Sequence, residues 1–359
     1  MSLYLLALGV FAMGTSEFML AGLVPGIAGA LDVSLAQAGY LTSAFAAGMV
    51  AGAPLMAALA RTWRPRTALV SFLALFVVVH VVGGLTTSFA VLLGTRVVAA
   101  VADAGFLAVA LTVERQGRAV AVLLGGTTLA CVAGIPGGAL LDAAFGWRSA
   151  FWTVAALCLP ALFGVARIAD TPAGGEADLR GELRELRRLP RVLLLGALVN
   201  AATFGVFAYL APVAGSAAPV VLAAFGLGCF AGVTAAGRLA DRWPGRVLAI
   251  GGALLLGGWI VLALVPTALV ALAFTQGALS FAVGGTVITR ILRLATGAPT
   301  MAGSYATAAL NIGATAGPVL AGAANPFWVA AALVAAAIAV AGRSGRPAGR
   351  ARSSRSRRR

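Results

Sequence analysis

Long apolar runs separated by short polar connections make up most of the chain. Cutting at charged residues and at clusters of glycine and proline gives twelve runs: 3–24, 37–60, 67–86, 89–112, 119–141, 149–168, 191–213, 217–238, 247–266, 267–289, 300–322 and 325–342. Each is about as long as the helix of roughly 20 residues that crosses the hydrocarbon core of a bilayer. The pattern predicts twelve membrane-spanning helices, with the least marked boundary near Pro266, where no charge separates two runs.

Composition and charge are typical of an integral membrane protein. Hydrophobic residues make up 61% of the 359 residues and charged residues only 10%, whereas about a quarter of an ordinary soluble protein is charged. The net charge of +15 would suggest a nucleic-acid partner in a soluble protein. Here the basic residues, all of them arginine, lie at the ends of the apolar runs. We therefore expect lipid, and no nucleic acid, around this chain.

The arginines also predict an orientation. Cytoplasmic connections of membrane proteins are enriched in basic residues. If both termini are cytoplasmic, all of the 26 arginines except Arg96 and Arg148 fall on the cytoplasmic side. An odd number of helices would destroy this agreement.

A polar stretch divides the chain into two equal parts. Residues 1–169 form one predicted half of six helices, 170–190 a cytoplasmic linker and 191–342 the second half. The linker is read either as a short amphipathic helix or as a disordered connection. Residues 343–359 carry eight arginines without apolar periodicity, so we expect a disordered cytoplasmic tail drawn to anionic lipid.

The two halves repeat each other weakly. Aligning Arg66 with Arg246 requires nearly the same offset as aligning Pro136 with Pro318. Parallel repeats of this kind occur in transporters whose substrate site lies between the halves, near the middle of the membrane.

Three ionisable residues interrupt the apolar runs of the first half. Glu17 lies within the first run, and Arg96 and Asp103 lie two helical turns apart, on one face of the fourth. Charged groups at this depth are costly and usually face a polar interior or a functional path. Arg96 and Asp103 are functional candidates on this ground, although each can also serve only to satisfy the other or a backbone carbonyl.

Other chemistry-bearing residues give weaker signals. His80, near the outer end of the third run, is read as interfacial. Cys131, Cys158 and Cys229 lie in apolar runs and are read as small buried residues. We expect no metal site or disulfide, and no constellation of catalytic residues typical of an enzyme.

The connection after the eighth run extends from Gly237 to Arg246 and reads GRLADRWPGR. It resembles a cytoplasmic loop motif of the major facilitator superfamily. In that family the aspartate and arginines latch neighbouring helix ends in one conformation, which the resemblance carries to Asp241, Arg242 and Arg246. Membrane anchoring alone would explain the arginines but not Gly237 and Asp241. Arg61 stands at the matching position of the first half, so the latch is expected to be asymmetric.

A second motif lies in the fifth run. Gly134, Pro136 and Gly138 resemble the glycine-proline motif of the superfamily's exporters, and Gly317 and Pro318 are their counterpart in the eleventh run. Small residues allow helices to approach closely, and proline allows a bend. Ordinary helix packing explains these residues equally well.

Longer matches are GTSEFM from Gly14, LTSAF from Leu41 with GAPLM from Gly52, GALVNAATF from Gly196 and AGSYATAALN from Ala302. They narrow the resemblance to twelve-helix drug:proton antiporters, and within them to the chloramphenicol-resistance exporters of actinobacteria. The resemblance extends to about residue 342, and several loops are shorter than those of the family.

This resemblance implies an all-α protein of the bacterial plasma membrane that exports a small aromatic drug, with chloramphenicol as the first candidate, in exchange for protons. It implies a monomer that needs the proton gradient and no cofactor. Glu17, Asp103 and Arg96 are the candidates for proton coupling. The candidate substrate cavity comprises Asn200, Thr203, Phe204, Tyr209, Gln276, Tyr305 and Asn311, although hydrogen bonding between helices explains each of its polar members, taken alone, better.

Two alternatives stay open. One is an exporter of another small molecule, such as a sugar, nucleoside or metabolite. The other is a degenerate relative in which the short loops and the missing aspartate of the first half have ended transport.

Overall fold

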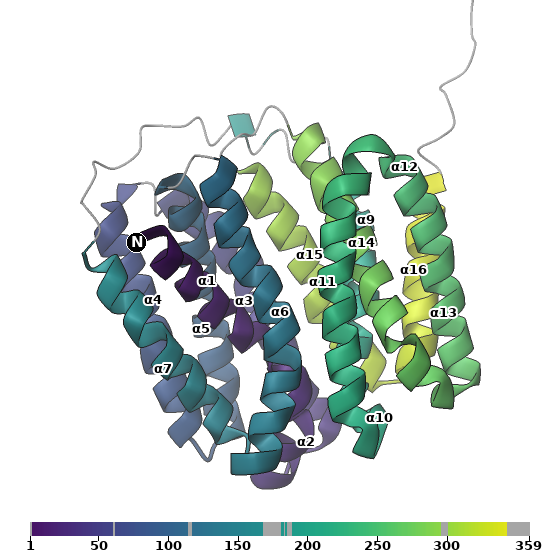
Figure 1. The fold of residues 1–359 in the computed structure, drawn as a ribbon, viewed down its shortest axis with the longest axis horizontal. Coiled ribbons are helices and arrows are strands. Elements are labelled where there is room, and N and C mark those ends of the chain that lie inside the picture. Colours follow the sequence, from purple (N-terminus) through teal and green to yellow (C-terminus); the bar gives the residue numbers. More distant parts are fainter. Residues whose placement is uncertain are drawn as a thin grey trace, which may run out of the picture.

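The computed structural model describes residues 2–59, 62–113, 117–167, 181–182, 184, 189–295 and 301–342. Most of the predicted linker and all of the predicted tail therefore lie outside the described residues. The described chain is helical throughout, and its helices lie roughly alongside one another in two groups (Figure 1).

The first group contains seven helical elements. They are α1 (Ser2–Phe18), α2 (Leu20–Leu31), α3 (Leu35–Leu59), α4 (Pro65–Leu85), α5 (Phe89–Val113), α6 (Gly117–Phe145) and α7 (Arg148–Val165). Proline opens α4, where its fixed φ suits the first turn of a helix and its missing N–H costs nothing.

The second group has more interruptions. Its α-helices are α9 (Pro190–Phe207), α10 (Leu210–Ala214), α11 (Ala218–Arg242), α12 (Pro244–Arg246), α13 (Gly252–Leu264), α14 (Leu269–Leu294), α15 (Ala302–Gly322) and α16 (Pro326–Gly342). The 3₁₀ turns η2 (Gly215–Ala217) and η4 (Pro266–Ala268) precede α11 and α14, and a stretch of π-helix, η3 (Val247–Gly251), joins α12 to α13. The break at Pro266 confirms the boundary that the sequence marked least clearly.

Eight helical spans in the described part of the chain are long and apolar enough to cross a membrane, or nine if a bent pair is counted as one span. The bent pair is α1 and α2, whose axes differ by 51°. The sequence predicts one helix ending near Val24, but the structure places a break at Met19 and continues the segment to Leu31. The break follows Glu17 by two residues.

Neighbour relations in the first group recur in the second. Helix α1 packs on α6 as α9 packs on α15, α3 on α5 as α11 on α14, and α4 on α7 as α13 on α16. This is the pattern that two parallel repeats produce. The groups meet along two seams, α3 against α15 and α6 against α11.

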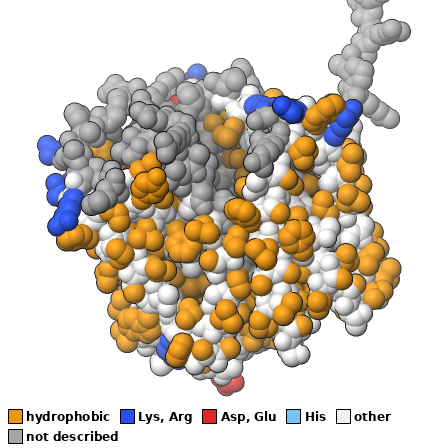
Figure 2. Space-filling view, viewed as in Figure 1, with side chains coloured by type: hydrophobic (Ala, Val, Ile, Leu, Met, Phe, Trp, Pro, Cys, Tyr) orange, Lys and Arg blue, Asp and Glu red, His pale blue; other side chains and the backbone are white. Residues whose placement is uncertain are grey.

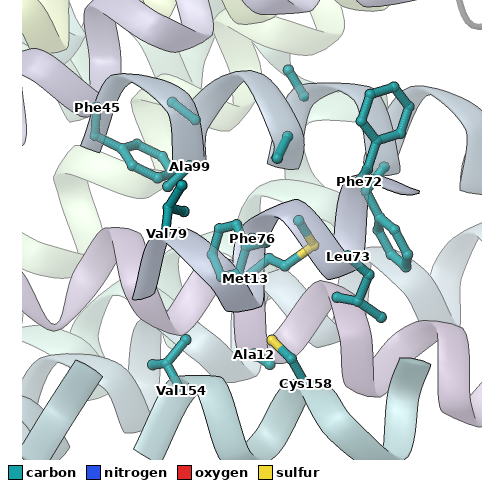
Figure 3. Packing of buried hydrophobic residues seen from close by; sticks show 14 of the residues in the cluster. Ala12, Met13, Phe45, Phe72, Leu73, Phe76, Val79, Ala99, Val154 and Cys158 are labelled. Atoms are coloured by element: carbon teal, nitrogen blue, oxygen red, sulfur yellow. The ribbon is translucent and has the colours of Figure 1, made fainter. Parts of the chain in front are cut away.

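Apolar side chains fill the first group and also cover its outside. Figure 3 shows Met13 of α1 beside Phe76 of α4, with Val154 and Cys158 of α7 nearby. Large apolar side chains such as Phe145, 78% exposed, lie on the surface. Figure 2 shows hydrophobic side chains over the side of the molecule and basic ones mainly along its upper edge, as a membrane protein requires.

Candidate functional site

Arg96 lies at the centre of a buried polar cluster in the first group of helices. Its side chain is 1% exposed, on α5. Nη1 donates to Ser16 Oγ at 2.7 Å and Nη2 donates to the Ser16 carbonyl oxygen at 2.8 Å. The guanidinium lies 4.7 Å from the ring centre of Phe45 and 5.9 Å from that of Phe151. Two charge-assisted hydrogen bonds and two aromatic faces thus compensate for the lost hydration of the cation.

Ser16 connects Arg96 to His80. Ser16 Oγ lies 2.6 Å from His80 Nε2, and His80 Nδ1 lies 2.7 Å from the Phe76 carbonyl oxygen. His80 is 1% exposed, and its ring centre is 4.2 Å from that of Phe76. The interfacial interpretation of His80 is therefore wrong, because the residue is enclosed by protein and hydrogen-bonded on both ring nitrogens.

Glu17 is next to this cluster. Its side chain is partly exposed, and it accepts no hydrogen bond and makes no ion pair with any described residue. It lies close enough to Arg96 and Asp103 for their charges to interact with its own. Glu17 is therefore an accessible carboxylate near Arg96, whose hydrogen bonds go to Ser16 instead.

Asp103 is more deeply placed than Glu17. It is 9% exposed and lies close enough to Arg96 for their charges to interact, with Cys158 of α7 nearby. The structure thus brings Glu17, Arg96 and Asp103 into one region, as the sequence predicts. The described hydrogen bonds of Arg96, however, go to Ser16 and not to Asp103.

The glycines of the fifth predicted run pack against the break that follows Glu17. A methyl group on Gly138 would lie 2.5 Å from the Met19 carbonyl oxygen, and one on Gly134 would lie 3.3 Å from Thr15. Pro136 lies between them, inside α6. In the matching packing of the second group, a methyl group on Gly317 would collide with the Ala201 carbonyl oxygen of α9. Pro318 follows inside α15.

Most of the polar cavity candidates make hydrogen bonds to backbone carbonyls. Asn200 donates to Leu310 at 2.8 Å, Thr203 to Val199 at 3.0 Å, Tyr209 to Pro318 at 3.2 Å, Gln276 to Leu255 at 3.5 Å and Asn311 to Thr307 at 2.9 Å. These bonds satisfy donors between and within helices. The Gln276 carbonyl oxygen has no partner in the described structure.

The candidates do not all gather in one place. Tyr305 packs with Met301 near the start of α15, and Ala57 and Leu193 pack against this pair. Its buried hydroxyl has no hydrogen-bond partner among the described residues. Tyr209 instead lies where α9 gives way to α10, and its hydroxyl is the atom closest to a methyl group built on Gly39.

An aromatic cluster joins the two groups of helices beside Glu17. The Phe18 ring lies 6.3 Å from that of Phe207 and 6.4 Å from that of Phe281. Phe204 lies edge-on to Phe207 at 5.6 Å, and Phe225 lies 6.1 Å from Phe207. Phe204 was a candidate from sequence, whereas Phe18 and Phe281 were missed. For Phe18 the one available signal was its position next to Glu17, and Phe281 had none.

The predicted latch is described in part. Arg246 stacks on Trp243 at 3.9 Å, and both Arg242 and Arg246 are exposed. The surroundings of Gly237 and of the Asp241 side chain lie outside the described part of the structure. Their predicted contacts stay predictions.

A metal centre has no support among the residues that the structure describes. No group of three or more histidine, cysteine, aspartate or glutamate side chains there could hold a metal ion.

Comparison with known proteins identifies the family. Residues 6–220 match the family model described as Major Facilitator Superfamily. The chain is 57% identical to the chloramphenicol resistance protein of Streptomyces lividans, over 94% of this chain and 95% of that protein. It is 34% identical to the inner membrane transport protein YdhP of Escherichia coli O157:H7, over 89% and 87% of the two chains.

The fold is similar to that of a solved transporter. The crystal structure of a bacterial homologue of the human lysosomal transporter Spinster, inward-facing and unoccupied, matches 96% of this chain and 91% of its own. The TM-score is 0.69 at 20% identity, so this likeness supports the fold alone.

These observations agree with one another. Membrane-spanning helices, an all-helical transporter fold and transporter relatives make this a multi-pass transporter of the bacterial plasma membrane and not an enzyme. The chain belongs to the Major Facilitator Superfamily.

Proposed function

We propose that this protein exports chloramphenicol, or a small aromatic drug of similar chemistry, in exchange for protons by alternating access. The observation that carries the proposal is the 57% identity, over nearly the whole length of both chains, to the Streptomyces lividans chloramphenicol resistance protein. The polar cluster around Glu17 and the aromatic cluster around Phe18 support it.

The proposed topology has twelve spans with both termini cytoplasmic. Eight single spans and the bent pair α1 and α2 meet the length and hydropathy test. We add α6, α15 and α16, each of which occupies an apolar run of the sequence. The polypeptide then carries both halves of the pathway, and it acts as a monomer. No cofactor is required beyond the proton gradient.

Glu17 carries the proton in this proposal. A carboxyl group that alternates between a desolvated site and water can bind a proton in one state and release it in another. Glu17 is partly exposed and has no described hydrogen-bond partner. It lies in the last turn of α1, two residues before the bend at Met19. Movement at the bend changes its surroundings, while Arg96 and Asp103 stay close enough to bias its charge.

The drug occupies the region between the halves, beside the aromatic cluster. Phe204, Phe207 and Phe18 offer faces and edges to a nitrophenyl ring. The remaining substrate candidates, Asn200, Thr203, Tyr209, Gln276, Tyr305 and Asn311, supply polar groups at separate places in the second group of helices. Gln276 offers an unpaired carbonyl oxygen and Tyr305 an unpaired hydroxyl.

Two motifs serve the conformational change. The glycines and prolines of α6 and α15 permit close packing against the helices that begin each half, α1 and α9. Gly237, Asp241, Arg242 and Arg246 form the cytoplasmic latch, which closes in one state and opens in the other.

Purified protein in proteoliposomes tests the proposal. With an acidic lumen, proteins whose cytoplasmic face points outward should take up labelled chloramphenicol as protons leave. An uncoupler should abolish this uptake. The absence of gradient-driven uptake by the wild-type protein would contradict chloramphenicol as the substrate.

Glu17→Gln separates coupling from substrate choice. The variant should insert normally but lose gradient-driven uptake, because the amide cannot carry the proton. Asp32→Asn is the matched control: Asp32 is exposed at the end of α2, in a left-handed conformation that asparagine also adopts. Uptake at the wild-type rate by Glu17→Gln would contradict its role.

A different substrate is the second candidate function. Relatives with 34% and 32% identity are named only as inner membrane transport proteins. Competition of sugars, nucleosides and other drugs against labelled chloramphenicol distinguishes the candidates. A protein that transports none of them would be the degenerate relative.

A further inference from the structure

His80 is a buried hydrogen-bonding group that the proposed transport mechanism does not use. It is the only histidine of the chain. Nδ1 faces the Phe76 carbonyl oxygen at 2.7 Å, and a carbonyl oxygen can only accept, so the ring carries a hydrogen on Nδ1. The neutral ring then presents a bare lone pair at Nε2, which faces Ser16 Oγ at 2.6 Å.

The hydroxyl of Ser16 has two neighbours with opposite requirements. Arg96 Nη1 can only donate to it, at 2.7 Å, and the bare His80 Nε2 can only accept from it. The serine therefore donates its own hydrogen to His80 and offers a lone pair to Arg96. Donors and acceptors run in one direction from Arg96 through Ser16 and His80 to Phe76. Such chains strengthen each of their hydrogen bonds.

Ser16 is also the point at which Arg96 contacts α1. The second hydrogen bond of Arg96, from Nη2, goes to the Ser16 carbonyl oxygen. Ser16 belongs to the last turn of α1, which ends at Phe18, and the carbonyls of a last turn need partners from outside the helix. Arg96 thus supports the helix end beside Glu17, and its Nε–H has no partner in the described structure.

We propose that His80 is a positioning residue for Arg96. By accepting the hydrogen of Ser16, it turns the serine oxygen toward the guanidinium and holds Arg96 across the last turn of α1, beside the partly exposed Glu17. The network links α4, α1 and α5, the three elements that contribute His80, Ser16 and Arg96. The transport assay of this proposal rests on the proposed function, whereas the NMR test of the hydrogen bonds does not.

A histidine that only fills space makes different predictions. A leucine of similar bulk would replace a space-filling histidine with little effect. A positioning histidine needs an acceptor at Nε2, which the side-chain oxygen of glutamine approximates. Two variants, His80→Leu and His80→Gln, therefore distinguish the roles.

Nitrogen NMR reads the network without a substrate. Because His80 is the only histidine, protein labelled with ¹⁵N-histidine and purified through a tag without histidine gives the signals of a single imidazole. We expect a protonated Nδ1 and a bare Nε2, and we expect Ser16→Ala to shift the Nε2 signal. Ser43→Ala is the matched control, since Ser43 is also buried but has no hydrogen-bond partner in the described structure. A hydrogen on Nε2, or an Nε2 signal indifferent to Ser16→Ala, would overturn the proposal.

Transport then tests the consequence. At equal abundance in the membrane, His80→Leu and Ser16→Ala should each lower the maximal rate of gradient-driven chloramphenicol uptake by about tenfold, the scale of a lost charge-assisted hydrogen bond. His80→Gln should keep most of the rate. The double variant should be no slower than either single variant, since both changes break one network.

The remaining outcomes are separable. Wild-type rates in His80→Leu, or additive losses in the double variant, would overturn the positioning role. If the wild-type protein transports no chloramphenicol, the proposed function fails instead. The NMR measurement then still decides whether His80 holds the Ser16 hydrogen.

Discussion

At the residue scale, the shape of the Arg96 side chain matters as much as its charge. Its two terminal nitrogens reach two different oxygens of Ser16, while its face lies on Phe45. Lysine keeps the charge but offers a single nitrogen and no planar face. We expect Arg96→Lys to lower the initial rate of gradient-driven uptake by about tenfold or more, because one charge-assisted hydrogen bond is lost.

Arg148→Lys is the control for this change. Arg148 also donates to a backbone oxygen, that of Thr86 at 3.0 Å, and also stacks on an aromatic ring, that of Trp147. It does so outside the buried cluster, between the ends of two helices. Its replacement should leave the rate near that of the wild type. Equal losses in both variants would assign the effect to arginine chemistry in general and not to Arg96.

Sequence reasoning found the charges of the site but not their connections. Glu17, Arg96 and Asp103 were recognisable because a charge inside an apolar run demands an explanation. Ser16 and His80 were not, because burying a serine or a neutral histidine costs less free energy than burying a charge. In addition, Ser16 is separated from His80 by 64 residues and from Arg96 by 80 residues along the chain. The one signal was His80 itself, the only histidine, within an apolar run.

At the scale of elements, the contact between α6 and the end of α1 should be intolerant of added atoms. A methyl group on Gly138 would meet the backbone of Met19 at 2.5 to 3.0 Å, and backbone cannot rotate away as a side chain can. We expect Gly138→Ala to lower the free energy of unfolding by about 1 to 3 kcal/mol. Thermal unfolding of the purified protein measures this.

The neighbouring residue provides the control for that variant. A methyl group on Gly137 would have nothing within 4 Å. Alanine also favours the helix over glycine by about 1 kcal/mol, so Gly137→Ala should be neutral or stabilising. Similar destabilisation by both variants would show that helix geometry, and not the contact with Met19, is responsible.

The same contact explains why the bend at Met19 escaped prediction. Apolar runs specify that a helix forms and roughly where it lies, and most described helices end within a few residues of the predicted runs. Helix α2, however, continues to Leu31, where the first run was predicted to end near Val24. Met19 itself is neither proline nor glycine, the residues at which helices usually kink. The break is accompanied by close packing from Gly134 and Gly138, more than a hundred residues away, which no local pattern reveals.

A linker residue ties the connection between the halves to α15. Glu182, 6% exposed, accepts the Met301 N–H at 2.8 Å, just before α15 begins. Loss of a carboxylate cap at a helix start costs about 0.5 to 2 kcal/mol. In a cysteine-free background, Glu182→Ala should raise the reactivity of a cysteine placed at Ala57, which packs against this helix start.

Glu182→Gln tests whether the hydrogen bond is the cause. Its side-chain oxygen can still accept the Met301 N–H, so the reactivity at position 57 should stay near that of the Glu182 protein. An increase of the same size in both variants would make the negative charge responsible instead.

At the scale of the whole molecule, the repeat was predictable because similar residues recur at nearly the same offset in the two parts of the chain. The pairs Arg66 with Arg246 and Pro136 with Pro318 indicated an offset, and the packing of α1 on α6 recurs as α9 on α15. The contacts along the seam between the two repeats were harder to predict from the sequence. They join residues far apart in sequence, and apolar residues facing lipid look the same as those facing the other half.

Phe18 and Phe207 test whether the drug bridges that seam. They belong to different halves and pack edge to face at 6.3 Å, beside Glu17. If chloramphenicol binds between the halves, Phe207→Ala should raise its KM roughly two- to tenfold, the range expected for one lost aromatic contact. The maximal rate should change less, because Glu17, the proposed proton-coupling group, is untouched.

Phe327→Ala is the control for loss of a buried aromatic ring. Phe327 stacks on Trp259 at 6.3 Å, entirely within the second half. Its removal should lower stability and the amount of folded protein, but not the affinity for the drug. An unchanged KM in Phe207→Ala, or an equal increase in Phe327→Ala, would place the drug elsewhere. A selective increase in Phe207→Ala would instead mean that drug and proton meet where the two halves separate, so that opening the seam necessarily disturbs both.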